Sequence, residues 1–407
     1  MRKIVLSYAA AARAVQDYAC SLRPTRTESL PLLEALNRTL AAPVVADRDQ
    51  PPFARSTRDG FAVRSADLDP VAPLAVIGRL RAGEAWSGPP LAPGQAIEIM
   101  TGAPIPPGAD CVLMVEHTLA GPPNIVPKHS LAPGDNIVAA GAEARSGATL
   151  IPPGTRIGPQ HIALAAACGY ATVSVFTQPR VTILSTGDEL VPINRQPLPY
   201  QIRNSNAYSL AAQITRYGGI PLIRPAVPDD LDVSEAAIRA SLDSDLIVLS
   251  GGVSMGKYDF VEKALAKLNA TFSFTGAHIQ PGRPVVFGQL PVSISRQLPF
   301  FGLPGNPVST LVTFSLFAAP LVAALAGETT PGPRFAHARL KQSVEAKPNL
   351  TRFLPAFLES SIGRVTVQPI PWQGSGDQSA AAKTNCFLVV PEGATLAADD
   401  IVTVLQL

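Results

Sequence analysis

The sequence predicts a multidomain protein of the α/β plus β class, built around a mostly parallel sheet with helices on both faces. Its 407 residues exceed one ordinary domain and suggest roughly three or four. Between residues 176 and 330, strand-like and helix-like segments alternate, which is typical of a three-layer α/β domain. Short β-runs separated by Gly and Pro turns lie on either side of this region. The predicted division is a helical linking domain from residues 1–45 and 146–175, a β-rich insertion domain from 46–145, an α/β domain from 176–330 and a small β-barrel-like domain from 331–407.

Composition narrows the possible functions. With 46% hydrophobic residues the chain can bury sizeable cores, and its formal charge of +2 argues against nucleic acid as the main partner. The four cysteines lie far apart without metal-ligand spacing, which fits a reducing compartment and a cytoplasmic protein without structural zinc.

Two apolar segments could be mistaken for membrane segments. The first, residues 7–22, is interrupted by Arg13 and Asp17, so a surface helix capped by Ser7 is favoured over a secretory signal. The second, residues 307–327, is uncharged and long enough to span a bilayer. Because it contains Pro320 and follows a Gly-Asn-Pro start, we expect a buried helix with Asn306 at the cap and no membrane contact.

The remaining elements follow from periodicity and turn signals. Three β-runs are expected in the insertion, at residues 74–80, 95–100 and 111–117, and one helix is expected after it, at residues 158–170. In the α/β region four strands alternate with four helices. The strands are expected at residues 181–185, 221–227, 245–250 and 298–304, and the helices at residues 207–219, 233–242, 260–268 and 307–327. Five further β-runs fill the last 75 residues.

Polar residues gather where the predicted parallel strands end. Residues 186–189 follow the first strand, Asp229 and Asp230 the second, residues 250–259 the third, and residues 304–309 the last. Ligands of open α/β sheets bind beyond the carboxyl ends of the strands. Carboxylates beside anion-binding turns indicate a divalent cation, Mg²⁺, bridging to a phosphate, although each acid alone also fits a helix cap.

One of these turns nearly matches a triphosphate-binding loop. Gly251 and Gly256 have the spacing of GxxxxGK and Lys257 follows, but Tyr258 occupies the position of the magnesium-binding hydroxyl. The mismatch argues against a nucleoside triphosphatase. Backbone N–H groups of the turn could still bind an anion, and the alternative is a tight turn that needs glycine only for its dihedral angles.

Six motifs in order carry a resemblance to a known family: PPFARSTRDGFAV, IMTGAPIPPGADCVLMVE, LSTGDELV, SGGVSMGKYDF, QPGRPVVFG and LPGNPVST. Together, over most of the chain, they closely resemble the molybdopterin molybdenumtransferase family, to which the E domain of gephyrin also belongs. The α/β region by itself resembles the molybdopterin adenylyltransferases.

The resemblance implies an elongated homodimer that acts at the end of molybdenum cofactor synthesis. Members of the family insert molybdate into adenylylated molybdopterin and hydrolyse the adenylate to release AMP, with a divalent cation assisting. A transient contact with molybdopterin adenylyltransferase would fit this role. The alternative is a non-catalytic scaffold or molybdopterin-binding protein of the same fold, since a relative anchors receptors.

Site residues follow from the motifs by position. Asp59 and Thr101 would face the α/β domain of the partner subunit, and Arg283 stands where the family has lysines. The implied catalytic residues are Asp59, Glu189 and Asp259, and the implied metal ligands are Asp259 and Asp229. The implied substrate-binding residues are Thr101, Gly251, Gly252, Ser254, Gly256, Arg283, Pro304, Gly305, Asn306, Ser309 and Ser375.

Overall fold

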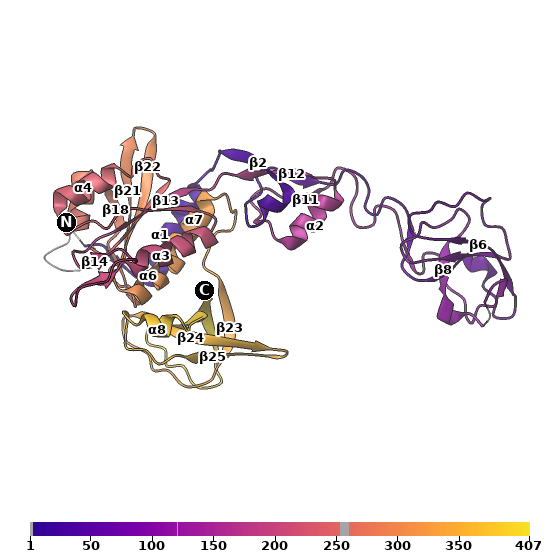
Figure 1. Ribbon diagram of the computed structural model, residues 1–407. Coiled ribbons are helices and arrows are strands. Elements are labelled where there is room, and N and C mark those ends of the chain that lie inside the picture. The colour runs from indigo at the N-terminus through magenta and orange to yellow at the C-terminus, as the bar shows by residue number, and fades with distance from the viewer. Residues whose placement is uncertain (1–2, 120, 253–259) are drawn as a thin grey trace. The chain divides into compact units, whose positions relative to one another are not determined.

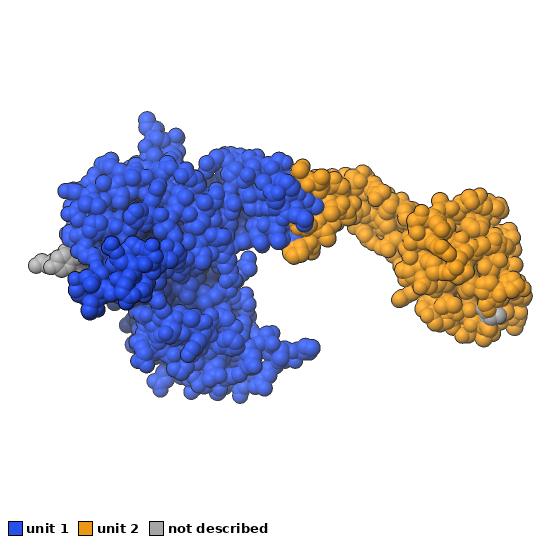
Figure 2. Space-filling view, viewed as in Figure 1, with its two compact units in different colours: residues 1–41, 154–158, 173–407 blue, residues 42–153, 159–172 orange. Residues whose placement is uncertain are grey.

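The computed structural model describes residues 3–119, 121–252 and 260–407. The chain forms two compact units (Figure 2). The first contains residues 1–41, 154–158 and 173–407, and the second contains residues 42–153 and 159–172. The finer division into four domains stays a prediction.

The centre of the first unit is a six-stranded mixed sheet. Its spatial order is β16 (Ile220–Ile223), β13 (Arg180–Ser185), β17 (Leu246–Ser250), β22 (Arg296–Leu303), β21 (Val286–Ser293) and β18 (Thr271–Phe274). The first four strands run parallel, and β21 is antiparallel to both of its neighbours. The sequence predicted these four parallel strands and the mostly parallel sheet. It did not predict the antiparallel strands β18 and β21.

Helices cover both faces of this sheet, as predicted (Figure 1). The strands are buried on two sides because their apolar side chains alternate: Val181 and Ile183 of β13 face one core cluster, and Leu184 faces the other. The first cluster includes α1 (Tyr8–Ser21), α3 (Ser205–Arg216) and the long helix that follows β22. The second includes α4 (Leu231–Arg239) and α5 (Phe260–Lys267).

Helix α1 confirms the predicted N-terminal cap. The Ser7 hydroxyl accepts a hydrogen bond from the backbone N–H of Ala10 at 3.2 Å. Ala11, Val15 and Ala19 are buried on one face of the helix and join the core of the α/β sheet.

The long apolar helix is a core helix. It consists of α6 (Pro307–Thr313), a π-helical turn (Phe314–Ala318) and α7 (Ala319–Leu325). Residues 307–325 have a mean hydropathy of 2.0, which is enough to span a membrane by composition, but 89% of the apolar stretch is buried inside the protein. Pro320 falls in the first turn of α7, directly after the π-turn, where a missing N–H costs little.

The last strands form the predicted barrel. β24 (Thr351–Ser361), β25 (Arg364–Pro369), β23 (Phe335–Leu340), β27 (Ile401–Gln406) and β26 (Cys386–Val390) pair in this order, and β26 pairs back to β24. The ring of five strands is therefore closed around its own apolar core. β20 (Ile279–Gln280) adds to β24, which ties the barrel to the segment before β21.

One expectation about the N-terminal residues is wrong. Residues 1–45 were expected to be helical, but after α1 the chain forms β2 (Thr27–Pro31), a 3₁₀ turn (Leu32–Ala35) and β3 (Val44–Val45). Pro24 and Pro31 disfavour a continuous helix there, and β2 pairs with the distant β12 (Thr172–Phe176). A pairing across this sequence distance leaves no local signal.

The second unit contains a five-stranded sheet in the order β8 (Cys111–Met114), β5 (Gly60–Val63), β7 (Gln95–Ile99), β6 (Leu74–Leu80) and β9 (Asn124–Ile125). β6, β7 and β8 are the three runs predicted for the insertion. Helix α2 (Pro159–Ala167) is the predicted helix after it. Apolar side chains pack on both faces of the sheet, as Phe61 and Ala62 show by joining different clusters.

Candidate functional site

Three parallel strands of the first unit end at the same level. Ser185 of β13 is in register with Ser250 of β17, and Ser250 with Leu303 of β22. The ladder continues one step into the turns, because the N–H of Thr186 donates to Ser250 O at 3.0 Å and that of Gly251 donates to Leu303 O at 3.1 Å. These turns form one edge, which we call the rim: residues 186–189, 227–230, 250–252 and 303–306.

Two glycines allow the turns to approach each other closely. Gly251 has φ +94 and a Cβ there would lie 2.6 Å from Thr186 O, while Gly252 has φ +64 and a Cβ there would lie 2.8 Å from Thr186 Oγ1. Any other residue would meet both backbone strain and a collision. Gly305 lies beside them, since a Cβ on it would be in ordinary van der Waals contact with Gly251 Cα, at 3.7 Å.

The carbonyl groups along the β22–α6 turn are all engaged inside the protein. Leu303 O accepts from Gly251 N–H, and Pro304 O accepts from the Thr310 hydroxyl at 2.6 Å. Gly305 O accepts from the Asn206 amide at 2.7 Å, and Asn306 O accepts from Thr310 N–H at 2.9 Å. Each of these four carbonyl oxygens therefore already accepts a hydrogen bond from within the protein.

Several hydrogen-bond donors of the same region have no acceptor in the described structure. Within the described part of the chain, the N–H groups of Gly252, Gly305 and Asn306 have no hydrogen-bond acceptor. The Thr186 hydroxyl, which lies beside Gly251 and Gly252, is buried and has no partner among the described residues. We call these three N–H groups and this hydroxyl the donor cradle. A surface that presents donors and withholds acceptors favours an anion.

The start of α6 is held by the barrel. The Asn306 side chain stands at the N-cap position, as predicted, but makes no capping bond and donates instead to the Ser375 hydroxyl at 2.9 Å. Ser375 O accepts from the Val308 N–H at 2.9 Å. The predicted residues Pro304, Gly305, Asn306 and Ser375 thus lie together. Ser309 is buried in the first turn of α6, at 4% exposure.

Arg283 lies on a turn packed against the same helix. A Cβ on the preceding Gly282 would lie 2.3 Å from Thr313 Cγ2 and 3.6 Å from Ser309 O, so the turn touches α6 through backbone. The Arg283 side chain is exposed. The sequence indicated Arg283 as a cation of the site but did not indicate Arg352. Arg352 comes near this turn only because β20 pairs with β24, which places Arg352 opposite Gln280. Burial lowers the pKa of Arg352.

Three carboxylates of the first unit occupy the other end of the rim. Asp188 accepts from the Asp229 N–H at 3.1 Å. The pKa of Asp229 is raised, mainly by burial and then by repulsion from Asp188 and Glu189. Glu189 folds back over Gly187, since a Cβ on Gly187 would lie 2.4 Å from Glu189 Oε2. The rim therefore concentrates negative charge beside a cradle of donors.

These carboxylates do not complete a metal site by themselves. Among the described residues, no three His, Cys, Asp or Glu side chains are arranged to hold a metal ion. Asp259, which was predicted both as a catalytic residue and as a metal ligand, lies outside the described residues. The predicted substrate-binding residues Ser254 and Gly256 also lie outside them.

In the second unit the structure brings Asp59 and Thr101 into direct contact. Asp59 precedes β5 and Thr101 follows β7, and the two strands pair antiparallel. Thr101 donates to Asp59 Oδ1 from its backbone nitrogen at 2.7 Å and from its hydroxyl at 2.9 Å. These bonds, the backbone one first, hold the pKa of the exposed Asp59 below its ordinary value.

Asn206 is a residue that sequence reasoning missed. Its amide nitrogen lies within hydrogen-bond distance of Gly305 O, Ser250 Oγ and Thr310 Oγ1. No local signal distinguishes it from an ordinary first-turn residue of α3, because all three partners are distant in sequence.

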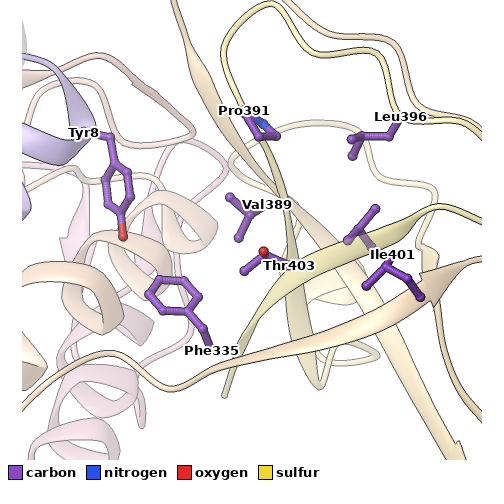
Figure 3. A pocket seen from close by; sticks show the side chains of 8 residues that line it. Tyr8, Phe335, Val389, Pro391, Leu396, Ile401 and Thr403 are labelled. Carbon is purple, nitrogen blue, oxygen red and sulfur yellow. The ribbon is translucent and has the colours of Figure 1, made fainter.

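A cavity of about 280 Å³ lies away from the rim, where Tyr8 of α1 meets the barrel (Figure 3). Its lining is mainly apolar and includes Phe335, Val389, Leu396 and Ile401. Burial raises the pKa of Tyr8 to about 12. None of the predicted site residues lines this cavity.

Three family profiles match the chain in order. The MoeA N-terminal region (domain I and II) matches residues 6–169, a probable molybdopterin binding domain matches residues 182–324, and the MoeA C-terminal region (domain IV) matches residues 337–407. The second profile covers the sheet and the rim, and the third covers the barrel.

Known proteins resemble the chain over nearly its whole length. The molybdopterin molybdenumtransferase of Bacillus subtilis is 37% identical over 90% of this chain and 86% of its own length. That of Haemophilus influenzae is 34% identical, with 94% of each chain covered. The solved structure of the molybdopterin biosynthesis moeA protein from Pyrococcus horikoshii is similar at a TM-score of 0.78 and 26% identity, covering 99% of this chain and 100% of that one.

Proposed function

The chain belongs to the molybdopterin molybdenumtransferase family, and we propose that it inserts molybdenum from molybdate into adenylylated molybdopterin, hydrolysing the adenylate and releasing AMP. This reaction lies within molybdenum cofactor biosynthesis. In it, water attacks one phosphorus of the phosphoanhydride, the bridging P–O bond breaks, and AMP and the phosphate of the pterin separate.

The donor cradle carries the proposal. Adenylylated molybdopterin is an anion with a phosphoanhydride, and the N–H groups of Gly252, Gly305 and Asn306 lack acceptors in the described structure. Charged oxygens accept stronger hydrogen bonds than neutral ones, so a phosphate benefits most from such donors. The cradle lies beyond the carboxyl ends of parallel strands, where α/β sheets bind their ligands.

Molybdate is a second anion and needs its own donors. In this proposal Arg283 and Ser375 bind it, since the exposed guanidinium lies on the turn against α6 and the Ser375 hydroxyl lies at the start of that helix. Ser309 supports the site from its buried position in α6.

The carboxylates act on water and on the metal oxyanion. We assign Glu189 and Asp59 to positioning water or molybdate, and Asp229 to a divalent cation together with Asp259. Mg²⁺ prefers oxygen ligands such as these, and it would neutralise charge on the phosphates when bound. Because the described carboxylates alone do not form a metal site, the Mg²⁺ assignment depends on Asp259.

The same proposal includes a cytoplasmic homodimer that contacts molybdopterin adenylyltransferase transiently. Light scattering at micromolar concentration tests the dimer, and a strictly monomeric protein would remove the basis for a role of Asp59 across subunits.

The decisive experiment measures AMP. The purified protein is incubated with adenylylated molybdopterin and magnesium, with and without molybdate, and AMP is quantified by chromatography. We expect molybdate-dependent AMP release, which slows in Asp259→Asn. Stoichiometric binding of the adenylate without release in any condition would instead identify a scaffold.

A further inference from the structure

Asn206 joins three separate elements through one nitrogen. It lies in the first turn of α3, two residues after the cap residue Asn204. Its Nδ2 is 2.7 Å from Gly305 O, 3.1 Å from Ser250 Oγ and 3.3 Å from Thr310 Oγ1. An amide nitrogen carries two hydrogens, so the shortest contact takes one and the two hydroxyls share the other.

The contact to Gly305 O fixes the direction of a neighbouring donor. The carbonyl of Gly305 and the N–H of Asn306 belong to the same peptide group, which is planar, so in its trans form the two bonds point in opposite directions. When Asn206 holds the carbonyl toward α3, the Asn306 N–H must point away from α3. This N–H is one of the three free donors of the cradle.

The next peptide is held in the same way through Thr310. The Thr310 hydroxyl donates to Pro304 O at 2.6 Å, and Pro304 O shares a peptide group with the Gly305 N–H. Because Asn206 Nδ2 also contacts this hydroxyl, it favours the orientation in which the hydroxyl hydrogen points at Pro304 O. Two of the free N–H groups are therefore aimed by one network that begins at Asn206.

We propose that Asn206 is a positioning residue that orients the Gly305 and Asn306 N–H groups for the phosphate of the adenylate. This inference rests on the proposed function, because it assigns the phosphate to the donor cradle. Without the Asn206 amide, the Gly305–Asn306 peptide is free to turn and to present its carbonyl oxygen to the anion. Such an oxygen would repel a phosphate and leave a neutral ligand unaffected.

The test compares AMP with adenosine, which share the nucleoside and differ in the phosphate. Dissociation constants are measured by isothermal titration calorimetry for the wild type, Asn206→Asp and Asn206→Ala. We expect the wild type to prefer AMP, and both variants to bind AMP about tenfold more weakly, the loss of roughly one hydrogen bond to a charged group. Adenosine binding should be unchanged.

Gln213→Glu is the matched control. It makes the same amide-to-carboxylate change on α3, about two turns further along, at a residue whose side chain hydrogen-bonds only to Ser209 and Ser315 in the described structure. Its preference for AMP should equal that of the wild type. Asn206→Ala separates loss of the donor from added charge, and it serves alone if Asn206→Asp fails to fold.

Two results would overturn the inference, and they differ in what else they affect. If the Asn206 variants keep the wild-type preference for AMP, Asn206 does not position the donors, and the proposed function stands. If the wild type itself does not prefer AMP over adenosine, the cradle is not a phosphate site, and the proposed function loses its main support.

Discussion

Thr101 donates two hydrogen bonds to one oxygen of Asp59, from its backbone nitrogen at 2.7 Å and from its hydroxyl at 2.9 Å. The two residues are 42 positions apart in sequence. Because the bonds favour the charged carboxylate, the pKa of Asp59 is lowered, and Asp59 stays ionised at neutral pH. A carboxylate of lowered pKa is a weak base, so the geometry favours positioning of water or molybdate over proton abstraction.

Replacing Thr101 by Val tests this pair. Thr101→Val removes the hydroxyl bond and keeps the larger contribution from the backbone N–H, so the pKa of Asp59 should rise only part of the way to its ordinary value. Carboxyl NMR titration measures this pKa, and Thr101→Ser, which keeps the hydroxyl, is the control. Because its pKa is lowered, the ionised Asp59 stabilises the fold at pH values above its ordinary pKa. That stability is lost as the pH falls through the lowered pKa. An unchanged pKa in Thr101→Val would show that the hydroxyl bond contributes nothing.

Asp229 should show the opposite pH dependence. Its pKa is raised by burial and by Asp188 and Glu189, so the charged carboxylate destabilises the folded state above the raised pKa. We expect Asp229→Asn to raise the melting temperature at pH 7 and to slow AMP release. The difference in melting temperature should vanish as pH falls below the ordinary value, where both states of the wild type are protonated.

The control for Asp229 is its neighbour. Asp230 caps α4 by accepting from the N–H groups of Asp232 and Val233 at 2.9 Å. Asn is an equally good cap, so Asp230→Asn should change stability little. If Asp229→Asn and Asp230→Asn stabilised the protein equally, the cause would be the general loss of negative charge. Repulsion among Asp188, Glu189 and Asp229 would then not explain the effect.

The two turns of the cradle should respond differently to an added methyl group. Gly251→Ala forces a side chain onto φ +94 and to within 2.6 Å of Thr186 O, and we expect a loss of about 1–3 kcal/mol in the free energy of unfolding. Gly305→Ala places its methyl 3.7 Å from Gly251 Cα, without strain, so stability should change by less than about 0.5 kcal/mol. Because that methyl lies between the turns, Gly305→Ala should still weaken AMP binding. Normal AMP affinity in a stable Gly305→Ala protein would place the phosphate elsewhere.

Ser375 links the barrel to the start of α6. Ser375→Ala removes the acceptor of the Asn306 amide, and because Asn306 is exposed to water the loss of stability should be small, about 0.5–1 kcal/mol by chemical denaturation. The KM for molybdate should rise more than kcat falls. Ser379→Ala, at an exposed position of the short helix α8 (Gln378–Ala381) that follows, should change neither quantity. An equal effect of both variants on KM would remove Ser375 from the molybdate site.

Local sequence signals predicted the four parallel strands of the sheet with their helices and turns, because alternation and glycine position are local properties. They placed Gly251, Gly305 and Asn306 on one edge, since carboxyl ends of parallel strands meet. They did not predict that Asn306 would bond to Ser375 instead of capping its own helix. Asn206 and Arg352 were missed for the same reason. Their partners come from β17, the turn after β22, α6 and β20, and only the folded chain brings these together.

Whether the cradle binds phosphate is measured most directly by amide NMR during titration with AMP and, separately, with adenosine. We predict that the N–H resonances of Gly252, Gly305 and Asn306 move downfield with AMP, as N–H groups do when they gain a charged acceptor, and that adenosine leaves them in place. AMP binding that perturbs amides in another region and leaves these three unchanged would contradict the account.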